Sequence, residues 1–321
     1  MIDVINLALP FFGLIVLGFL CGKMMRLPES GLAWMNFYIV YCALPPLFFK
    51  LVVNTPFEQL QNWWFIIGTT LSTYIAFVLS LLVGLWASKG EMKPATAQAV
   101  LGAYSNIGYM GPPLTLAAIG AQAAAPTALI FVFDNILLFT LIPFLMSLGG
   151  TEKLDVMKTV KMVLWRIVTH PFNVATIIAI IAAYFQLKPP AAIDRMINLL
   201  YGSAAPVALF ALGVTVALRP VGRVPKEIPI HLFVKMAIHP VLILVLLSFI
   251  GGFERDWVYT AVLMAALPPA LNVFIVARQY NTYIEQASTA LLLGTLISIV
   301  SVTWVLYLIT TQTLPYPLFG R

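Results

Sequence analysis

Two short segments, one in each half of the 321-residue chain, place prolines and an asparagine inside otherwise apolar runs, and the first segment also contains two glycines. The first break spans residues 103–114 (AYSNIGYMGPPL) and the second break spans residues 266–272 (ALPPALN). Neither can be a regular helix, because proline removes a backbone donor and glycine permits unusual backbone angles. A half-helix that starts at such a break presents free N–H groups and a partial positive charge, which suits a carboxylate. The breaks therefore predict an anion site that needs no buried basic residue.

Asp134 is the only acidic residue that lies well inside an apolar run of the chain. A carboxylate in such a place is costly to keep and is a functional candidate for that reason. It could take up and release protons, bind a cation, or pair with Lys235 in a later apolar run. The alternative is a structural role, in which a neutral or paired Asp134 holds its helix against its neighbours. We take ion or proton coupling as the working hypothesis for this residue.

The composition identifies the elements that must position these residues. Hydrophobic residues make up 61% of the chain and charged residues 9%, against about 45–50% and about 25% in soluble domains. A soluble enzyme is excluded, and so is a nucleic-acid binder, since the net charge of +6 forms no basic run. Lipid requires helices for such runs. The expected fold is an all-α polytopic membrane protein with ten spans, near residues 4–22, 33–53, 63–87, 95–118, 126–147, 163–185, 193–218, 230–250, 256–279 and 287–310.

Lysine and arginine are distributed unevenly between the loops that join these spans. The odd-numbered loops and their edges hold thirteen of the 18 basic residues, and the even-numbered loops with the C-terminus hold five. Cytoplasmic loops carry the excess of positive charge in membrane proteins. The odd-numbered loops are therefore expected in the cytoplasm and both termini outside.

The chain contains the trace of an internal repeat. Three prolines of the first half recur 161 residues later, since Pro10, Pro28 and Pro45 are followed by Pro171, Pro189 and Pro206. Each half holds five spans, an odd number, so the second half must cross the membrane with the opposite topology. Such inverted repeats are typical of secondary transporters, which bind substrate where paired broken helices meet. We expect two inverted five-helix repeats, residues 1–150 and 151–321, joined by a basic loop over residues 148–161, with spans four and nine broken at a shared crossover.

The two breaks also resemble motifs of the auxin efflux carrier family. The string SNIGYMGPPL (residues 105–114) is similar to the fourth-span motif of that family, and LPPALNVFIVARQYN (residues 267–281) is similar to the ninth-span motif. The positions that carry the resemblance are Asn106, Met110, Gly111, Pro113, Leu114, Leu267, Pro268, Phe274, Ala277, Arg278, Tyr280 and Asn281. The number of spans, their orientation and the position of the central loop also agree with that family, so the resemblance covers the whole chain. The short loop is typical of bacterial members described as malonate or organic-acid transporters.

The resemblance implies that the spans form two subdomains with different roles. Spans 1, 2, 6 and 7 would form a scaffold that makes a homodimer, and spans 3–5 and 8–10 would form a mobile transport unit. It also implies that Asn106 contacts substrate, whereas Ser105 stands where the plant carriers have proline, which disfavours auxin as the substrate. The candidate substrate-binding residues are Ser105, Asn106, Gly108, Met110, Pro113, Pro268, Pro269 and Asn272.

These observations favour a secondary active transporter that moves a small carboxylate or dicarboxylate across a bacterial inner membrane by alternating access. The alternatives are an anion channel, which would need polar rings along a pore, and an intramembrane enzyme, which would need a nucleophile beside a base. No catalytic residue, cofactor or metal site is expected, since the two cysteines, Cys21 and Cys42, have no metal-ligand spacing. The expected partners are the anion, the lipid bilayer and a second copy of the chain.

Overall fold

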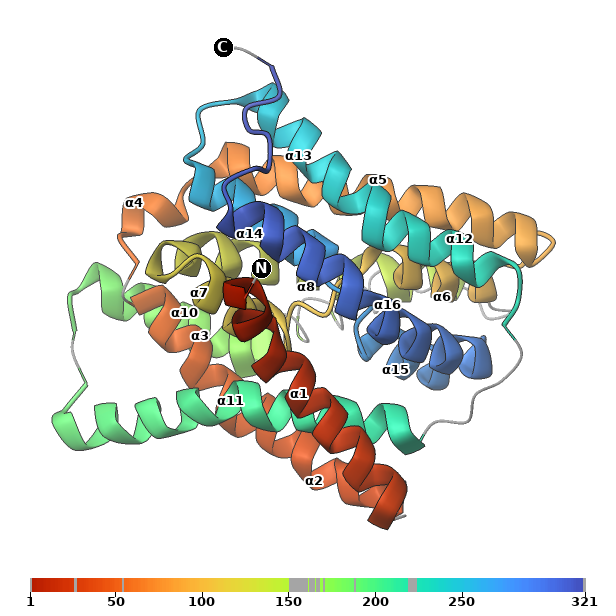
Figure 1. Ribbon diagram of the computed structural model, residues 1–321, viewed down its shortest axis with the longest axis horizontal. Helices are drawn as coiled ribbons and strands as arrows, with labels where there is room; N and C mark the ends of the chain where they lie inside the picture. Colours follow the sequence, from red (N-terminus) through yellow and green to blue (C-terminus); the bar gives the residue numbers. More distant parts are fainter. Residues whose placement is uncertain are drawn as a thin grey trace.

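Every regular element in the described part of the chain is helical (Figure 1). The computed structural model describes residues 2–25, 28–53, 55–149, 171–187, 189–218 and 224–319, together with residues 161, 165, 168 and 169. Within these residues the one extended pairing is an isolated antiparallel bridge between Ser105 and Pro269. The predicted repeat boundary at residues 150 and 151, and residues 150–160 of the predicted basic loop, lie outside the described residues.

Most neighbouring helices in the described part of the chain are joined by short connections. The longer ones are α1 (Ile2–Met25), α3 (Leu44–Val53), α5 (Trp63–Ala87), α6 (Met92–Ala103), α8 (Ala124–Leu148), α10 (Pro171–Tyr184), α11 (Ala191–Leu218), α13 (His239–Ile250), α14 (Arg255–Ala266) and α16 (Ile284–Thr310). The shorter ones are α2 (Leu32–Phe37), α4 (Phe57–Leu60), α7 (Gly111–Ala118), α12 (Glu227–Phe233) and α15 (Asn272–Gln279). Two π-helical turns, η2 (Tyr38–Ala43) and η4 (Val234–Ile238), join α2 to α3 and α12 to α13, and two 3-10 turns, η1 (Glu29–Gly31) and η3 (Ala121–Ala123), precede α2 and α8.

Within the described residues, seven continuous helical stretches are long and apolar enough to cross a membrane, as predicted for seven of the ten spans. They are Asn6–Met25, Leu32–Val53, Glu58–Ala87, Ala121–Leu148, Ala191–Leu218, Glu227–Ile250 and Ile284–Thr310. Two further predicted spans, 95–118 and 256–279, are each divided by a break into half-helices, α6 with α7 and α14 with α15. The predicted sixth span is represented by α10, whose apolar part is shorter than the seven. The breaks therefore explain why two apolar runs do not form single long helices.

Most of the described helices pack in two groups, which contact each other through α3 and α8 and through α1 and α16; α4 contacts α10 and α8 and is in neither group. In the first helix group (α1, α2, α3, α10 and α11), α11 packs against α1, α2 and α3, and α10 packs against α3. Glycines allow the closest approach, since a Cβ at Gly18 would lie 2.1 Å from the Phe210 carbonyl oxygen and one at Gly213 would lie 2.0 Å from that of Ile15. Small residues at helix crossings are typical of membrane proteins, where close backbone packing drives association.

The second helix group contains α5–α8 and α12–α16. Figure 1 shows α5, α12 and α13 at its outer edge and α16 between them and the α1–α11 pair, and α16 contacts α1 and α11 directly. The half-helices α6 and α14 lie inside this group: every residue from Ala95 to Ala103 and from Trp257 to Ala266 is buried. A broken backbone is tolerated at membrane depth only where protein surrounds it. The burial of α6 and α14 meets that requirement.

Candidate functional site

The two breaks cross each other and satisfy each other's backbone. The Asn106 N–H donates to the Pro268 carbonyl oxygen at 2.8 Å, and the Ala270 N–H donates to the Tyr104 carbonyl oxygen at 3.2 Å. Tyr104 is extended, with φ −82° and ψ 111°, because it must leave α6 to reach the second break. Buried backbone groups need partners. The crossing supplies partners that the interrupted helices cannot.

Four half-helix ends face this crossing. α6 and α14 end there at Ala103 and Ala266, and α7 and α15 begin just beyond it, at Gly111 and Asn272. The starts of α7 and α15 bring partial positive charge, and the ends of α6 and α14 bring carbonyl groups and partial negative charge. Few N–H groups are free there, because Pro112 and Pro113 have none and the N–H groups of Val273 and Phe274 donate to the carbonyl oxygens of Ala270 and Leu271. One small region thus combines partial charges of both signs.

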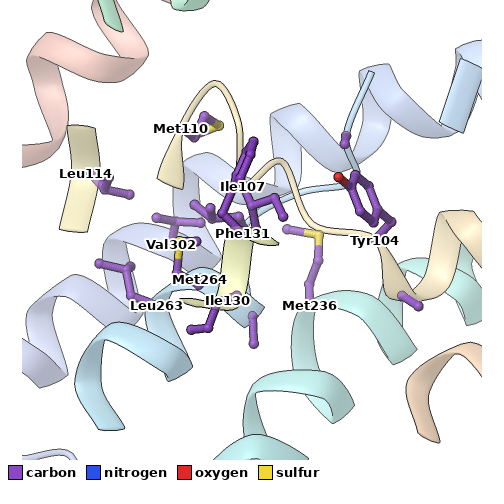
Figure 2. Close-up of a cluster of buried hydrophobic side chains, with 14 of the residues drawn as sticks. Tyr104, Ile107, Met110, Leu114, Ile130, Phe131, Met236, Leu263, Met264 and Val302 are labelled. Atoms are coloured by element: carbon purple, nitrogen blue, oxygen red, sulfur yellow. The ribbon is translucent and has the colours of Figure 1, made fainter. Parts of the chain in front are cut away.

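Apolar side chains hold the first break in place. Figure 2 shows Ile107 beside Phe131 of α8, with Met264 of α14 close to them and Met110 on the turn that leads into α7. A Cβ at Gly111 would lie 2.7 Å from the Met264 sulfur, so the start of α7 lies directly against α14. The turn is therefore fixed by packing as well as by the backbone crossing.

A cavity of about 320 Å³ lies beside the crossing. It extends to Asn36 of α2 on one wall and to Gln279 at the end of α15. Its polar lining residues are Asn36, Tyr104, Asn106, Tyr109, Asn135, Asn272, Gln279 and Tyr280. No Asp, Glu, Lys, Arg or His is among the described residues that line it. Any charge on a ligand here would meet amides, hydroxyls and helix ends rather than a fixed counter-charge.

Two asparagines of the cavity differ in what they contact. The Asn135 side chain is satisfied, since its Oδ1 accepts from the Tyr104 hydroxyl at 2.8 Å and its Nδ2 donates to the Phe131 carbonyl oxygen at 2.6 Å. The Asn106 side chain is equally buried, with 3% of its surface exposed, but its Nδ2 has no hydrogen-bond partner within the described part of the chain. Buried polar groups rarely remain unpaired. The Asn106 Nδ2 group is thus an unpaired hydrogen-bond donor at the cavity wall.

The structure sorts the predicted substrate-binding residues into three places. Asn106, Gly108 and Asn272 line the cavity. Ser105, Pro268 and Pro269 form the backbone crossing instead, and the buried Ser105 hydroxyl has no partner among the described residues. Met110 and Pro113 do not line the cavity; Met110 caps α7 with 1% of its surface exposed, and Pro113 lies in the first turn of α7. Their side chains are directed by packing rather than by the cavity.

Several cavity residues were not identified from sequence. Asn36, Tyr104, Tyr109, Asn135 and Gln279 come from α2, the first break, α8 and α15. Asn135 carried a local signal, because it adjoins Asp134 in an apolar run, and Tyr104 and Tyr109 lie within the first break. Asn36 and Gln279 are single polar residues near predicted span ends, where polar residues are common. Their convergence depends on how the helices pack.

Asp134 does not line the cavity. It lies on α8 with 3% of its surface exposed, and its Oδ1 accepts from the Thr73 hydroxyl of α5 at 3.0 Å. Lys235, the predicted partner, is fully buried on η4. No direct ion pair joins the two side chains in the described part of the chain, although they interact electrostatically. The alternative in which Asp134 pairs with Lys235 therefore does not take the form of a direct contact between the two side chains.

Comparison with known proteins covers nearly the whole chain. Residues 3–306 match the model of the family described as membrane transport protein. A protein of Rhizobium meliloti (strain 1021), named a candidate malonate transporter, is 44% identical over 99% of this chain and 100% of its own length. Auxin efflux carrier component 8 of Arabidopsis thaliana is 24% identical over 92% of this chain and 94% of its own. An uncharacterized transporter of Methanothermobacter thermautotrophicus is 24% identical over 90% and 92%.

Proposed function

The chain belongs to the membrane transport protein family, that of the auxin efflux carriers, and we propose that it is a secondary active transporter for a small carboxylate or dicarboxylate. Membership makes it an integral, multi-pass membrane transporter and not an enzyme. In the proposed mechanism substrate binds beside the crossing of the two breaks and is released to either side by alternating access.

The observation that carries the proposal is the unpaired Asn106 amide on the wall of an uncharged cavity. A carboxylate oxygen would accept from its Nδ2, and the partial positive charge at the starts of α7 and α15 would favour the anion. Hydrogen bonds to a charged acceptor are about twice as strong as neutral ones. A cavity of about 320 Å³ lies at the lower end of the size range of ligand pockets, roughly 300–1,000 Å³, and so favours a small anion. Malonate is the first substrate to test, because the Rhizobium relative is named for it.

Alternating access in this proposal uses the two helix groups as separate bodies. The first helix group would be the scaffold of spans 1, 2, 6 and 7, and the second helix group the transport unit of spans 3–5 and 8–10. The full plan would be ten spans in two inverted repeats, residues 1–150 and 151–321. Two observations support this plan: the breaks cross in an antiparallel arrangement, and helices pack together within each group.

The proposed topology places both termini outside the bacterial inner membrane. The cavity reaches Asn36 and Gln279, which adjoin the predicted odd-numbered loops, so in this topology it faces the cytoplasm. A second hollow of about 470 Å³, lined by Lys50, Gln59 and Gln122 among others, lies toward the even-numbered loops. Fusion of alkaline phosphatase to the C-terminus tests the orientation: the enzyme is expected to be active, and inactive fusions with full expression would contradict it.

A homodimer through the first helix group is a further part of the proposal. The exposed Trp34, Phe37 and Tyr41 side chains of α2 and η2 give this group an apolar outer face. Mass measurement of the purified protein in detergent is expected to give twice the chain mass of 35.3 kDa. A mass of one chain at all protein concentrations would contradict the dimer.

Asp134 is proposed as the ion- or proton-coupling residue. It is the one buried carboxylate within the described part of the chain, and it lies between α5 and η4 in the second helix group. A carboxylate kept at this depth is expensive unless it serves transport or is paired. Its isolation from the cavity means that it would act on the crossing through neighbouring groups rather than on substrate directly.

Counterflow in proteoliposomes tests the transport proposal. Vesicles loaded with unlabelled malonate are expected to take up labelled malonate, with saturation, and the assay extends to other mono- and dicarboxylates. A channel would instead give unitary currents without counterflow. The anion proposal is wrong if no carboxylate exchanges while a cationic or neutral solute does.

A further inference from the structure

A chain of four buried polar side chains runs through the second helix group. We call Asp134, Thr73, His239 and Lys235 the buried relay; each has at most 3% of its surface exposed. The Thr73 hydroxyl lies 3.0 Å from Asp134 Oδ1 and 3.4 Å from His239 Nε2, and Lys235 Nζ lies 3.3 Å from His239 Nδ1. The residues come from α8, α5, α13 and η4, so the relay joins four separate segments.

The hydrogen bonds of the buried relay can all point the same way. An ammonium has donors only and a carboxylate acceptors only, so Lys235 donates to His239 Nδ1 and Asp134 accepts from Thr73. His239 is then the neutral tautomer that carries its proton on Nε2 and donates to the Thr73 oxygen. This assignment follows from the network. It leaves each member with a partner and connects a buried cation to a buried carboxylate.

The relay ends on the second break. Lys235 Nζ also donates to the carbonyl oxygen of Ala265, in the last turn of α14. In a continuous helix that carbonyl would accept from the N–H four residues later, but residue 269 is proline and has none. Lys235 therefore satisfies the carbonyl that Pro269 leaves open, at the helix end that favours a cation.

Carriers with broken helices commonly bind a coupling cation at such a place, where half-helix C-terminal ends and freed carbonyls meet. Here the place holds the Lys235 ammonium. We propose that Lys235 is the resident cation of the crossing and that His239 and Thr73 transmit the charge state of Asp134 to it. The carrier therefore couples to protons through the buried relay and needs no sodium. This inference rests on the proposed transport function.

The coupling step balances as a proton shift along the relay. A shift of one proton at each of three hydrogen bonds, from Lys235 to His239, His239 to Thr73 and Thr73 to Asp134, converts the ammonium and carboxylate into a neutral amine and a neutral acid. A proton taken up from solution then restores the ammonium while Asp134 remains neutral. Because the His239 proton is now on Nδ1, the ammonium keeps its hydrogen bond to the Ala265 carbonyl oxygen but no longer donates to His239.

Other titratable groups surround the buried relay. Tyr74 of α5 and Tyr104 of the first break interact electrostatically with Asp134. His231, one turn before Lys235, is hydrogen-bonded to Gln98 of α6 instead. None of these side chains links Asp134 to Lys235 by hydrogen bonds in the described part of the chain, so the connection depends on Thr73 and His239.

Thr73 and Thr69 form a matched pair for testing the relay. Both lie on α5, one turn apart, and both have 2% of their surface exposed. Among the described residues, the Thr69 hydroxyl donates only to the carbonyl oxygens of Phe65 and Ile66 in its own helix. The Thr73 hydroxyl also lies 3.3 Å from the carbonyl oxygen of Thr69, but it joins Asp134 to His239 as well. Thr→Val keeps the shape and removes the hydroxyl at either site.

The experiment measures labelled malonate in proteoliposomes in two ways: counterflow at equal pH, and accumulation driven by a pH gradient. Thr73→Val is expected to lose at least tenfold in accumulation and to keep counterflow within threefold. Thr69→Val is expected to stay within twofold in both, and Thr73→Ser, which restores a hydroxyl, to recover accumulation to within threefold. Replacing sodium by choline on both sides is expected to leave wild-type accumulation within twofold.

Several results would contradict the relay, the proton coupling or the transport function. The relay is wrong if Thr73→Val accumulates malonate like Thr69→Val, if Thr73→Val loses counterflow as well, or if Thr73→Ser fails to recover. Proton coupling is wrong if the wild type exchanges malonate but a pH gradient drives no accumulation, or if choline lowers accumulation tenfold. Absence of wild-type counterflow with every carboxylate contradicts the proposed function itself.

Discussion

Asn106 and Asn135 are expected to respond to alanine substitution in opposite ways. Both line the cavity and both have 3% of their surface exposed, but only the Asn135 side chain is fully hydrogen-bonded. Asn106 Nδ2 has no hydrogen-bond partner among the described residues. Asn106→Ala should therefore weaken substrate binding and leave the stability of the empty protein unchanged or higher, whereas Asn135→Ala should lower that stability.

The expected magnitudes follow from the contacts. Loss of one hydrogen bond to a charged group costs about 1.5–3 kcal/mol, which for Asn106→Ala corresponds to an increase in malonate Kd of about 10- to 150-fold. Asn135→Ala removes the acceptor of the Tyr104 hydroxyl and leaves that buried group without this partner, which costs about 1–3 kcal/mol of stability.

Two measurements on each purified variant test the contrast: malonate Kd by equilibrium binding, and the midpoint of thermal unfolding in detergent without ligand. The wild type is the reference for both, and added malonate should raise its midpoint. The reasoning is refuted if Asn106→Ala binds malonate with wild-type affinity, or if it lowers the midpoint of the empty protein as much as Asn135→Ala does.

Three further predictions concern other parts of the molecule. Gly213→Leu should prevent the close packing of α1 and α11, because even a Cβ there would lie 2.0 Å from the Ile15 carbonyl oxygen; the yield of monodisperse protein should fall severalfold, and an unchanged yield would contradict this packing. Asp134→Asn should bind and exchange malonate but lose accumulation driven by a pH gradient; persistent accumulation would make Asp134 structural. Burial, with Glu227 beside it, raises the pKa of Tyr283, so the folded protein holds that proton more tightly than the unfolded chain. The contribution of this proton to the free energy of unfolding should be complete below about pH 10, the usual Tyr pKa, and should decline above it. Thermal unfolding midpoints of wild type and Tyr283→Phe, measured from pH 8 to 11, test this. Midpoints that change with pH in parallel for the two proteins would refute it.

Much of the fold could be predicted from the sequence, because the bilayer makes helices of apolar runs whatever their surroundings. Seven of the ten predicted spans correspond to helices long and apolar enough to cross a membrane. The breaks were predictable for an equally local reason: each combines two adjacent prolines with an asparagine in one short segment, whereas the single prolines Pro10, Pro143 and Pro206 lie inside continuous helices. Ser105 and Pro268, which the sequence places in the two breaks, lie at the crossing.

The candidate site was less predictable, because neighbours in sequence point in different directions. Asn106 and Gly108 reach the cavity, but Met110 is turned into the packing around the start of α7. Asn36 and Gln279 line the same cavity although 243 positions separate them in the chain. Single polar residues at helix ends give no sign of such convergence.

By itself, the sequence determined that the chain is an all-helical membrane protein, where its long helices run and where two of its apolar runs break, since each depends on hydropathy or backbone chemistry within one segment. Only the tertiary structure decided what the polar residues do. It left Asn106 Nδ2 unpaired while pairing Asn135, and it placed Lys235 on the carbonyl that Pro269 leaves open. A buried polar group is defined by its partners, and those partners come from helices that are distant in sequence.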